Sequence, residues 1–387
     1  MMRSIADGKL DIAGGFEDSM GFCLGCLACE TACPADVDYS RLFEAARAAV
    51  DDDAEKRGTL SRFKRPLMRG LFGSRRRLRA AAGAMRLAER TGLRRLGVRS
   101  GLLRRAAPRL AELEPLAPPI SRTPSDRLIA PMERPAGAVR HRVQLLTGCV
   151  MNVSFADVNR QTADLLLSAG CEVHRAPAQQ CCGSLLGHNG DLEGARRMAR
   201  VEIAAFEAAL PMEETDAIIV NAAGCGAFMK DYGHLLAGDP EWADRAAAFA
   251  IRVRDVSEFL ASVERPPARH RVDAVATYQD ACHLVHGQRI ADAPRTLLAE
   301  VPGLTLIPMR DSTTCCGSAG IYNILQPEAS MELLKRKMEA VAETGATMAI
   351  AGNPGCVIQL LEGARRFGPA VEVLHPVTVL HRSWIGD

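Results

Sequence analysis

The sequence predicts an α/β protein with a short N-terminal α-helical ferredoxin-like segment, a basic helical linker and two tandem α/β Cys-rich modules. Three observations support this class. Four cysteines gather near the N-terminus, and an arginine-rich stretch follows them. From about residue 142, short runs rich in Val, Ile and Leu alternate with longer helical stretches, which is typical of βαβ units. The expected domains are residues 1–50, 51–139, 140–265 and 270–387.

The N-terminal cysteines form a CxxCxxCxxxCP run, made by Cys23, Cys26, Cys29 and Cys33. This is the ligand spacing of a bacterial-type [4Fe-4S] site, because two-residue gaps let one tight loop reach three corners of a cuboidal cluster. Zinc sites usually separate their CxxC pairs by a longer loop. In two-cluster ferredoxins the fourth Cys ligates the other cluster. Only one run is present here, so either Cys33 completes its own cluster or a partner motif is missing.

Residues 56–109 form a basic segment with eighteen Lys or Arg and one acidic residue, Glu89. Leu, Met and Phe are interleaved with the basic residues, and a basic amphipathic helix can lie on an anionic membrane surface or steer a protein partner. The alternative is a solvated arm whose arginines pair with acidic residues elsewhere in the fold. The segment is nearly free of aromatics and carries no nucleic-acid-binding motif, so nucleic acid is not an expected partner.

The two modules are predicted from alternating strands and helices. Helices are expected where apolar residues recur at three-to-four spacing and a Gly or Pro follows, at residues 158–168, 192–209 and 327–343. Strands are expected at residues 142–147, 171–175, 217–221, 272–277, 304–308, 348–351 and 371–374. The Pro-rich stretch at residues 265–269 is the predicted linker between the modules.

An internal repeat of cysteines is the stronger sign of two modules. The gap from the first Cys to the Cys-Cys-Gly pair is 32 positions in one copy and 33 in the other, and the next gap is 43 or 40 positions. Each copy supplies four thiolates, which are soft ligands suited to iron-sulfur clusters. The first and last cysteines of each copy follow predicted strands, where open α/β sheets bind ligands. The candidate ligands are Cys149, Cys181, Cys182 and Cys225, then Cys282, Cys315, Cys316 and Cys356.

Several residues outside this pattern have plainer interpretations. Cys171 lies within a predicted strand and is expected to be a small buried core residue. His283 follows Cys282 and is either a further ligand or a packing residue. Four further histidines are expected to be surface or core residues rather than catalytic groups: His174, His188, His234 and His375.

Composition and motifs limit the classes of function. The formal net charge is only +2, so there is no global bias toward nucleic acid. No apolar run reaches the length of a membrane-spanning helix, and the N-terminus has no signal-peptide core. Thirteen cysteines in a reducing cytoplasm are more often metal ligands than disulfides. Neither a dinucleotide-binding fingerprint nor a phosphate-binding loop is present, so flavin and NAD are not expected on this chain.

The cysteine motifs resemble the iron-sulfur subunit of glycolate oxidase. Its wider family includes lactate-utilisation iron-sulfur proteins, the Cys-Cys-Gly subunit of heterodisulfide reductase and the small subunit of anaerobic glycerol-3-phosphate dehydrogenase. The likeness covers nearly the whole chain and rests on residues 23–34, 223–233 and 315–322. Members usually carry two ferredoxin-type runs, and the single run here resembles the second. The sequence is therefore expected to begin late, through a mis-assigned start or a genuine loss.

The resemblance implies an electron-transfer subunit of a membrane-associated glycolate or other 2-hydroxy acid dehydrogenase. FAD-containing partner subunits would oxidise the substrate, and this chain would pass electrons toward a quinone pool or membrane acceptor. It would hold one N-terminal [4Fe-4S] cluster and one or two more in the Cys-Cys-Gly modules. The expected location is the cytoplasm, peripheral on the inner membrane.

Two alternatives remain open from the sequence. A Cys-Cys-Gly cluster could itself act on a thiol or disulfide, as the likeness to heterodisulfide reductase implies. A zinc-stapled interaction protein is the other, and it would give a colourless preparation.

Overall fold

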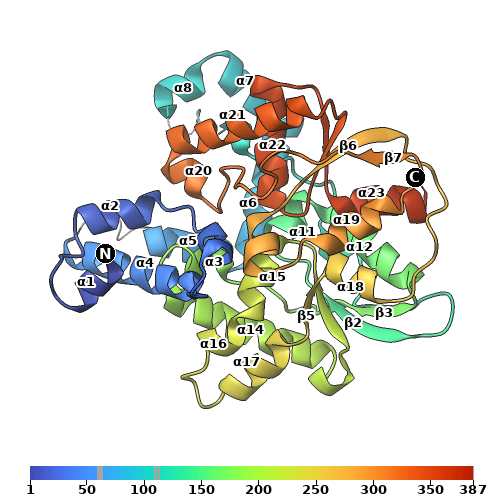
Figure 1. Cartoon of the computed structure of the whole chain (residues 1–387), viewed down its shortest axis with the longest axis horizontal. Helices are drawn as coiled ribbons and strands as arrows, with labels where there is room; N and C mark the ends of the chain where they lie inside the picture. The colour runs from blue at the N-terminus through green and yellow to red at the C-terminus, as the bar shows by residue number, and fades with distance from the viewer. Residues whose placement is uncertain (59–63, 109–110, 112–113, 387) are drawn as a thin grey trace.

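The computed structural model describes residues 1–58, 64–108, 111 and 114–386. An N-terminal helical segment lies at one end of the molecule (Figure 1). Its helices enclose a small core built from Phe16, Met20, Phe43, Ala46 and Val50. The helices are α1 (Met2–Ala6), α2 (Gly15–Phe22), α3 (Ala28–Ala32) and α4 (Tyr39–Lys56).

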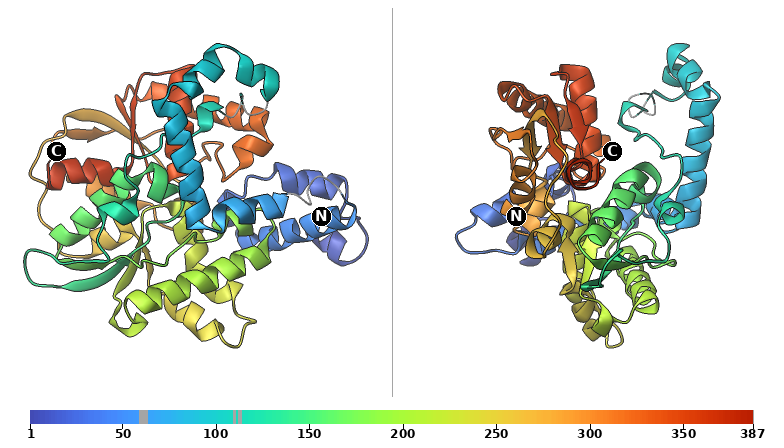
Figure 2. Two further views of the ribbon diagram at one scale, coloured as in Figure 1. Left: turned by 180° about the vertical axis from the view of Figure 1, so that it is seen from behind. Right: turned by 90° about the vertical axis from the view of Figure 1, so that its right-hand side faces the viewer.

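The basic segment is helical, as predicted, and it forms an arm along one side of the molecule, apart from the sheets (Figure 2). Arg62 and Arg109, which belong to this segment in the sequence, lie outside the described residues. The arm consists of α5 (Lys64–Phe72), α6 (Arg75–Arg90), α7 (Leu93–Arg99) and α8 (Leu102–Ala106). The chain then returns to the body through η2 (Glu114–Leu116) and α10 (Ser125–Leu128).

Module 1 is built on a five-stranded sheet in the order β1-β3-β2-β4-β5, with only β1 antiparallel. Its strands are β1 (Met132–Glu133), β2 (His141–Leu145), β3 (Cys171–His174), β4 (Ala217–Val220) and β5 (Val253–Asp255). Its helices are α11 (Val150–Ser154), α12 (Ala156–Ser168), α13 (Ser184–Gly187), α14 (Leu192–Ala209), η3 (Met212–Glu214), α15 (Ala223–Lys230), α16 (Tyr232–Leu235), α17 (Ala243–Ala250) and α18 (Val256–Ser262).

Module 2 repeats the arrangement with a four-stranded parallel sheet in the order β7-β6-β8-β9. Its strands are β6 (Ala274–Gln279), β7 (Leu304–Leu306), β8 (Met348–Ala351) and β9 (Glu372–Leu374). Its helices are the π-helix η4 (His283–Gly287), α19 (Asp292–Ala299), α20 (Tyr322–Leu325), α21 (Pro327–Glu343), α22 (Pro354–Phe367) and α23 (Pro376–Trp384).

The two sheets share one topology. Without the short antiparallel β1, the order in module 1 is β3-β2-β4-β5, which corresponds strand for strand to β7-β6-β8-β9 in module 2. The predicted α/β class is therefore confirmed. All seven predicted strands are present, although β6 begins two residues later than expected, at Ala274. The short strands β1 and β5 were not predicted.

The modules pack directly against each other. Helix α18 of module 1 lies against α19 of module 2, and α12 lies against α23. His375 donates a hydrogen bond across this junction from Nε2 to the carbonyl oxygen of Asn221, at 2.9 Å. Within the described residues, no helix is both long and apolar enough to cross a membrane.

Candidate metal centres

All eight repeat cysteines line one cavity of about 420 Å³ between the two modules. In module 1, Cys149 follows β2 at the start of α11, and Cys225 lies in the first turn of α15 after β4. The cysteines of module 2 occupy the matching positions beyond β6 and β8. The sites thus lie past the carboxyl ends of central strands, the usual ligand position in parallel α/β sheets. Cys171 is fully buried in β3 and does not line the cavity.

The four module 1 cysteines are joined by thiol contacts. Hydrogen bonds link Cys149 to Cys181, Cys181 to Cys182, and Cys182 to Cys225. Hydrogen bonds to Cys149 and Cys182, together with burial, raise the pKa of Cys181. Hydrogen bonds from Cys181 and Cys225 lower the pKa of Cys182. The Tyr232 hydroxyl donates to the Cys182 carbonyl oxygen at 2.6 Å and so fixes the backbone of the pair.

Module 2 repeats this chain of thiols. Contacts join Cys282 to Cys315, Cys315 to Cys316, and Cys316 to Cys356. The hydrogen bond to Cys315 and burial raise the pKa of Cys282. The Gly317 amide donates to Cys315 Sγ at 3.4 Å, so a glycine next to the pair brings an N–H to a sulfur. Such hydrogen bonds tune the reduction potential of a bound cluster.

The N-terminal cysteines lie on a tight loop that leads into α3. Gly25 and Leu27 both adopt left-handed backbone conformations, with φ of 65° and 63°. After burial, the neighbouring thiols Cys26 and Cys23 raise the pKa of Cys29. These three thiols therefore lie within electrostatic reach of one another. Cys29 itself is exposed. Cys33 follows the last residue of α3 and is partly buried.

The donor sets fit iron-sulfur clusters. Among the described residues, no three or more His, Cys, Asp or Glu side chains converge as one metal ion requires. An iron-sulfur cluster instead bonds each thiolate to a separate iron atom and replaces most of the space between them with its own atoms. Each module places four cysteine thiols on the cavity, which is the donor chemistry that such a cluster needs.

Two histidines stand beside the cavity. The rings of His188 and His283 contact each other at a tilt of 40°, with their centroids 5.1 Å apart, and both line the cysteine cavity. His283 Nδ1 lies 3.5 Å from Cys282 Sγ, and burial lowers the pKa of His283 to about 3. His188 Nδ1 lies 2.8 Å from a carboxylate oxygen of Glu44 in the N-terminal segment. No sequence motif marks His188, because its position depends on the meeting of three segments.

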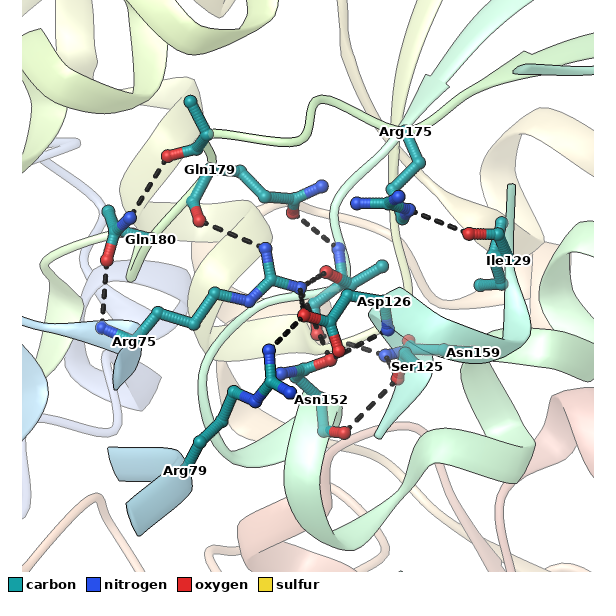
Figure 3. Close-up of polar contacts among 12 residues, drawn as sticks. Arg75, Arg79, Ser125, Asp126, Ile129, Asn152, Asn159, Arg175, Gln179 and Gln180 are labelled. Atoms are coloured by element: carbon teal, nitrogen blue, oxygen red, sulfur yellow. Dashed lines mark hydrogen bonds and ion pairs between the residues drawn. The ribbon is translucent and has the colours of Figure 1, made fainter. Parts of the chain in front are cut away.

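The basic arm is tied to the loops that carry the module 1 cysteines. Arg75, from the start of α6, donates to Thr147 Oγ1 and Asn152 Oδ1 and to the Gln179 carbonyl oxygen, at 3.2 to 3.3 Å (Figure 3). Thr147 and Gln179 each lie two residues before a candidate ligand cysteine. Nearby, Arg79 forms an ion pair with Asp126. Some arm arginines therefore pair within the fold, as one alternative predicted.

Comparison with known proteins identifies related families. A family described as "Cysteine-rich domain" matches residues 143–230 and 276–361. A second, described as "Glycolate oxidase iron-sulfur subunit, linker region", matches residues 60–117. The chain is 31% identical over 241 residues to lactate utilization protein A of Oceanobacillus iheyensis, covering 62% of this chain and 96% of that protein. The crystal structure of a hypothetical protein from Helicobacter pylori is also similar, and the match covers 68% of this chain and 54% of that chain. Its TM-score is 0.48 at 12% identity.

A further relative spans most of both chains. The probable glycolate oxidase iron-sulfur subunit of Bacillus subtilis is 37% identical over 375 residues, which cover 95% of this chain and 82% of that protein. A match of this extent includes the N-terminal cysteine run, the basic arm and both modules. The chain therefore belongs to the family of glycolate oxidase iron-sulfur subunits.

Proposed function

We propose that the chain is the iron-sulfur electron-transfer subunit of a membrane-associated dehydrogenase for glycolate or a related 2-hydroxy acid. The observation that carries the proposal is the convergence of eight cysteines from two repeated modules on one cavity. The name of the Bacillus subtilis relative supports the same role. The substrate-oxidising chemistry belongs, in this proposal, to FAD-containing partner subunits. The final acceptor is a quinone or another membrane acceptor.

The proposed ligands are the N-terminal and module cysteines. The N-terminal run holds one [4Fe-4S] cluster, and the thiol chains of modules 1 and 2 hold one cluster each. A bound cluster supplies reversible one-electron transfer at a potential set by hydrogen bonds, charge and burial. The chain itself supplies the thiolates, the N–H donor of Gly317 and a cavity with a largely apolar lining.

The metal content of the chain tests this proposal directly. Iron, acid-labile sulfide and zinc should be assayed on anaerobically purified protein, with about four iron and four sulfide expected per occupied site. Cys29→Ser, Cys182→Ser and Cys316→Ser should each remove iron from one site. Cys171→Ala is the matched control, because this thiol is buried away from the cavity, and it should keep the full content. Stoichiometric zinc without sulfide would contradict the proposal.

A second candidate is thiol or disulfide chemistry at a Cys-Cys-Gly site. The observation that favours it is the apolar wall of the cysteine cavity, to which Leu185, Ile321 and Ile324 contribute. Such a wall could hold an apolar substrate beside the cysteines. Turnover of a disulfide by the isolated chain would support this candidate. Activity that depends on an added flavoprotein would support electron transfer instead.

The basic arm is the surface that we propose to contact the membrane. Leu87, Leu93 and Leu96 are 61%, 61% and 64% exposed. The neighbouring Arg90, Arg95 and Arg99 form no ion pair within the part of the chain that the structure describes. Exposed leucines among unpaired arginines are the features by which helices bind the interface of anionic membranes. The arm also projects from the body, so a flat surface can reach it (Figure 2).

Vesicle binding tests the role of the arm. The full chain should sediment with vesicles that contain phosphatidylglycerol, less so at high salt, and not with phosphatidylcholine vesicles. Since each basic residue near an anionic surface contributes about 1 kcal/mol, replacing Arg90, Arg95 and Arg99 by Gln should weaken binding roughly 100-fold. Ile251→Gln removes an exposed apolar side chain at the end of α17 in module 1, outside the arm, and should bind normally. Equal binding to both kinds of vesicle, or unchanged binding by the triple variant, would contradict the proposal.

A further inference from the structure

The N-terminal cysteine loop lies against module 2. Cys26 and Cys315 line the same cavity, of about 370 Å³, together with Thr31, His286 and Thr313. Cys282 is among the groups that raise the pKa of Cys26, after burial. Two module 2 cysteines, Cys282 and Cys315, are therefore neighbours of Cys26.

A hydrogen-bonded bridge spans this second cavity. Thr31 Oγ1 lies 2.8 Å from His286 Nδ1, and His286 Nε2 lies 3.3 Å from the carbonyl oxygen of Thr313. A carbonyl oxygen only accepts, so Nε2 carries the proton and Nδ1 accepts from the Thr31 hydroxyl. Thr31 belongs to α3, which also carries Cys29. His286 comes four residues after Cys282 and Thr313 two residues before Cys315, so the bridge joins three cysteine-bearing segments.

Close packing supports the same contact. Leu27, from the N-terminal loop, is only 7% exposed. A Cβ atom added at Gly287 would come within 3.3 Å of its Cδ1 atom, so the glycine allows the loop to approach the π-helix. The Tyr322 hydroxyl donates to the Phe22 carbonyl oxygen at 3.1 Å, next to Cys23. Residues from two parts of module 2 thus hold both ends of the loop.

Module 1 touches the N-terminal segment in a different way. Among the described residues, its hydrogen bonds and ion pairs to this segment reach α4: Arg47 donates to the His188 carbonyl oxygen at 2.7 Å, and Arg41 pairs with Asp231 at 3.0 Å. Leu27 of the loop shares a cavity with Phe228 and Asp231 of module 1, and the lining residues of this cavity include no cysteine. Arg47 also donates to the Cys23 carbonyl oxygen, so a side chain of α4 holds the start of the loop. The side of the loop that carries Cys26 faces module 2.

We propose that the bridge made by Thr31, His286 and Thr313 pairs the N-terminal cysteine site with the cysteine site of module 2 rather than with that of module 1. This inference rests on the proposed function. Because the module cysteines share one cavity, the sites form a row: N-terminal, module 2, module 1. Thr31 and His286 act as positioning residues, since each works by holding the cysteine segments together.

Spin coupling between sites tests the order. The full chain, reduced anaerobically, should give an electron paramagnetic resonance signal from the N-terminal site that is broadened by its nearest paramagnetic neighbour. Cys316→Ala, in module 2, should narrow this signal, and Cys182→Ala, its counterpart in module 1, should leave it broadened. The reverse pattern, or equal narrowing in both, would overturn the inference. A wild-type chain without iron would instead overturn the proposed function, so the two failures are distinguishable.

The bridge itself is tested by variants that leave every cysteine in place. Thr31→Val keeps the shape of the side chain but removes the hydroxyl, and it should reduce the broadening while the iron content stays unchanged. Thr31→Ser keeps the hydroxyl and should show the same broadening as the wild type. Ser40→Ala is the matched control, because Ser40 Oγ bonds Asp38 within the same segment. Wild-type broadening in Thr31→Val would overturn the positioning role.

Discussion

At the scale of single residues, left-handed backbone positions decide whether the cysteine loops can form. Gly317 has φ of +91°, and a Cβ there would lie 2.5 Å from the Ser330 carbonyl oxygen. Gly25 has φ of +65°, and a Cβ there would lie 2.6 Å from the Phe43 ring. A side chain at either position meets both backbone strain and a steric clash. The cysteine spacing therefore describes only part of the site, because the glycines allow the backbone of the cysteine loops to turn.

Gly25→Ala should empty the N-terminal site while leaving both modules loaded. Phe43 belongs to the small core of the N-terminal segment, so moving its ring costs about 1–3 kcal/mol in addition to the backbone strain. Iron per chain should fall by about four. Gly21→Ala is the control, since no atom lies within 4 Å of its added Cβ, and it should retain all iron. Equal iron in the two variants would show that the loop tolerates a side chain.

At the scale of secondary structure, the sequence predicts most of both modules because their central strands are buried apolar runs. Strand β4 is completely buried, and helices α14 and α21 match their expected bounds. Strands β1 and β5 have two and three residues, too few to show a periodic pattern. The π-helix η4 also has no clear sequence signal.

The candidate site shows the same limit. The repeated spacing of cysteines predicts two four-thiol sets, because equivalent positions in repeated modules fold alike. It does not predict that both sets face one cavity, since that depends on how the modules dock. The contact between Thr31 and His286 joins residues 255 positions apart, and Arg75 reaches Gln179 across 104 positions. Neither pair stands in a motif, so only the fold brings these residues together.

At the scale of the whole molecule, the junction between the modules forms one wall of the cysteine cavity. Asn221 lines that cavity, and its carbonyl oxygen accepts the hydrogen bond from His375. The same imidazole caps α23, because its Nδ1 accepts from the Val377 amide at 3.2 Å. His375 must therefore be neutral, with its proton on Nε2. Protonation of Nδ1 would remove the cap.

The stability of this junction should decrease in acid. Burial lowers the pKa of His375 to about 4, whereas an unfolded histidine has a pKa of about 6.5. Between these values the unfolded chain binds the proton and the folded chain does not, so stability is lost as the pH falls below about 6.5. From about pH 7.5 to about pH 5.5 the expected loss is about 1.4 kcal/mol, and it approaches about 3 kcal/mol near pH 4.

Urea unfolding of wild type and His375→Asn at both pH values measures this contribution. Asparagine still caps a helix but does not titrate, so the variant should lack the loss of about 1.4 kcal/mol that His375 contributes. Acid damage to a bound cluster affects both proteins and cancels in their difference. His234→Asn is the control, because His234 is not part of the junction, and it should follow the wild type. If His375→Asn showed the same pH dependence as the wild type, the acid sensitivity of the chain would have to arise away from the junction between the modules.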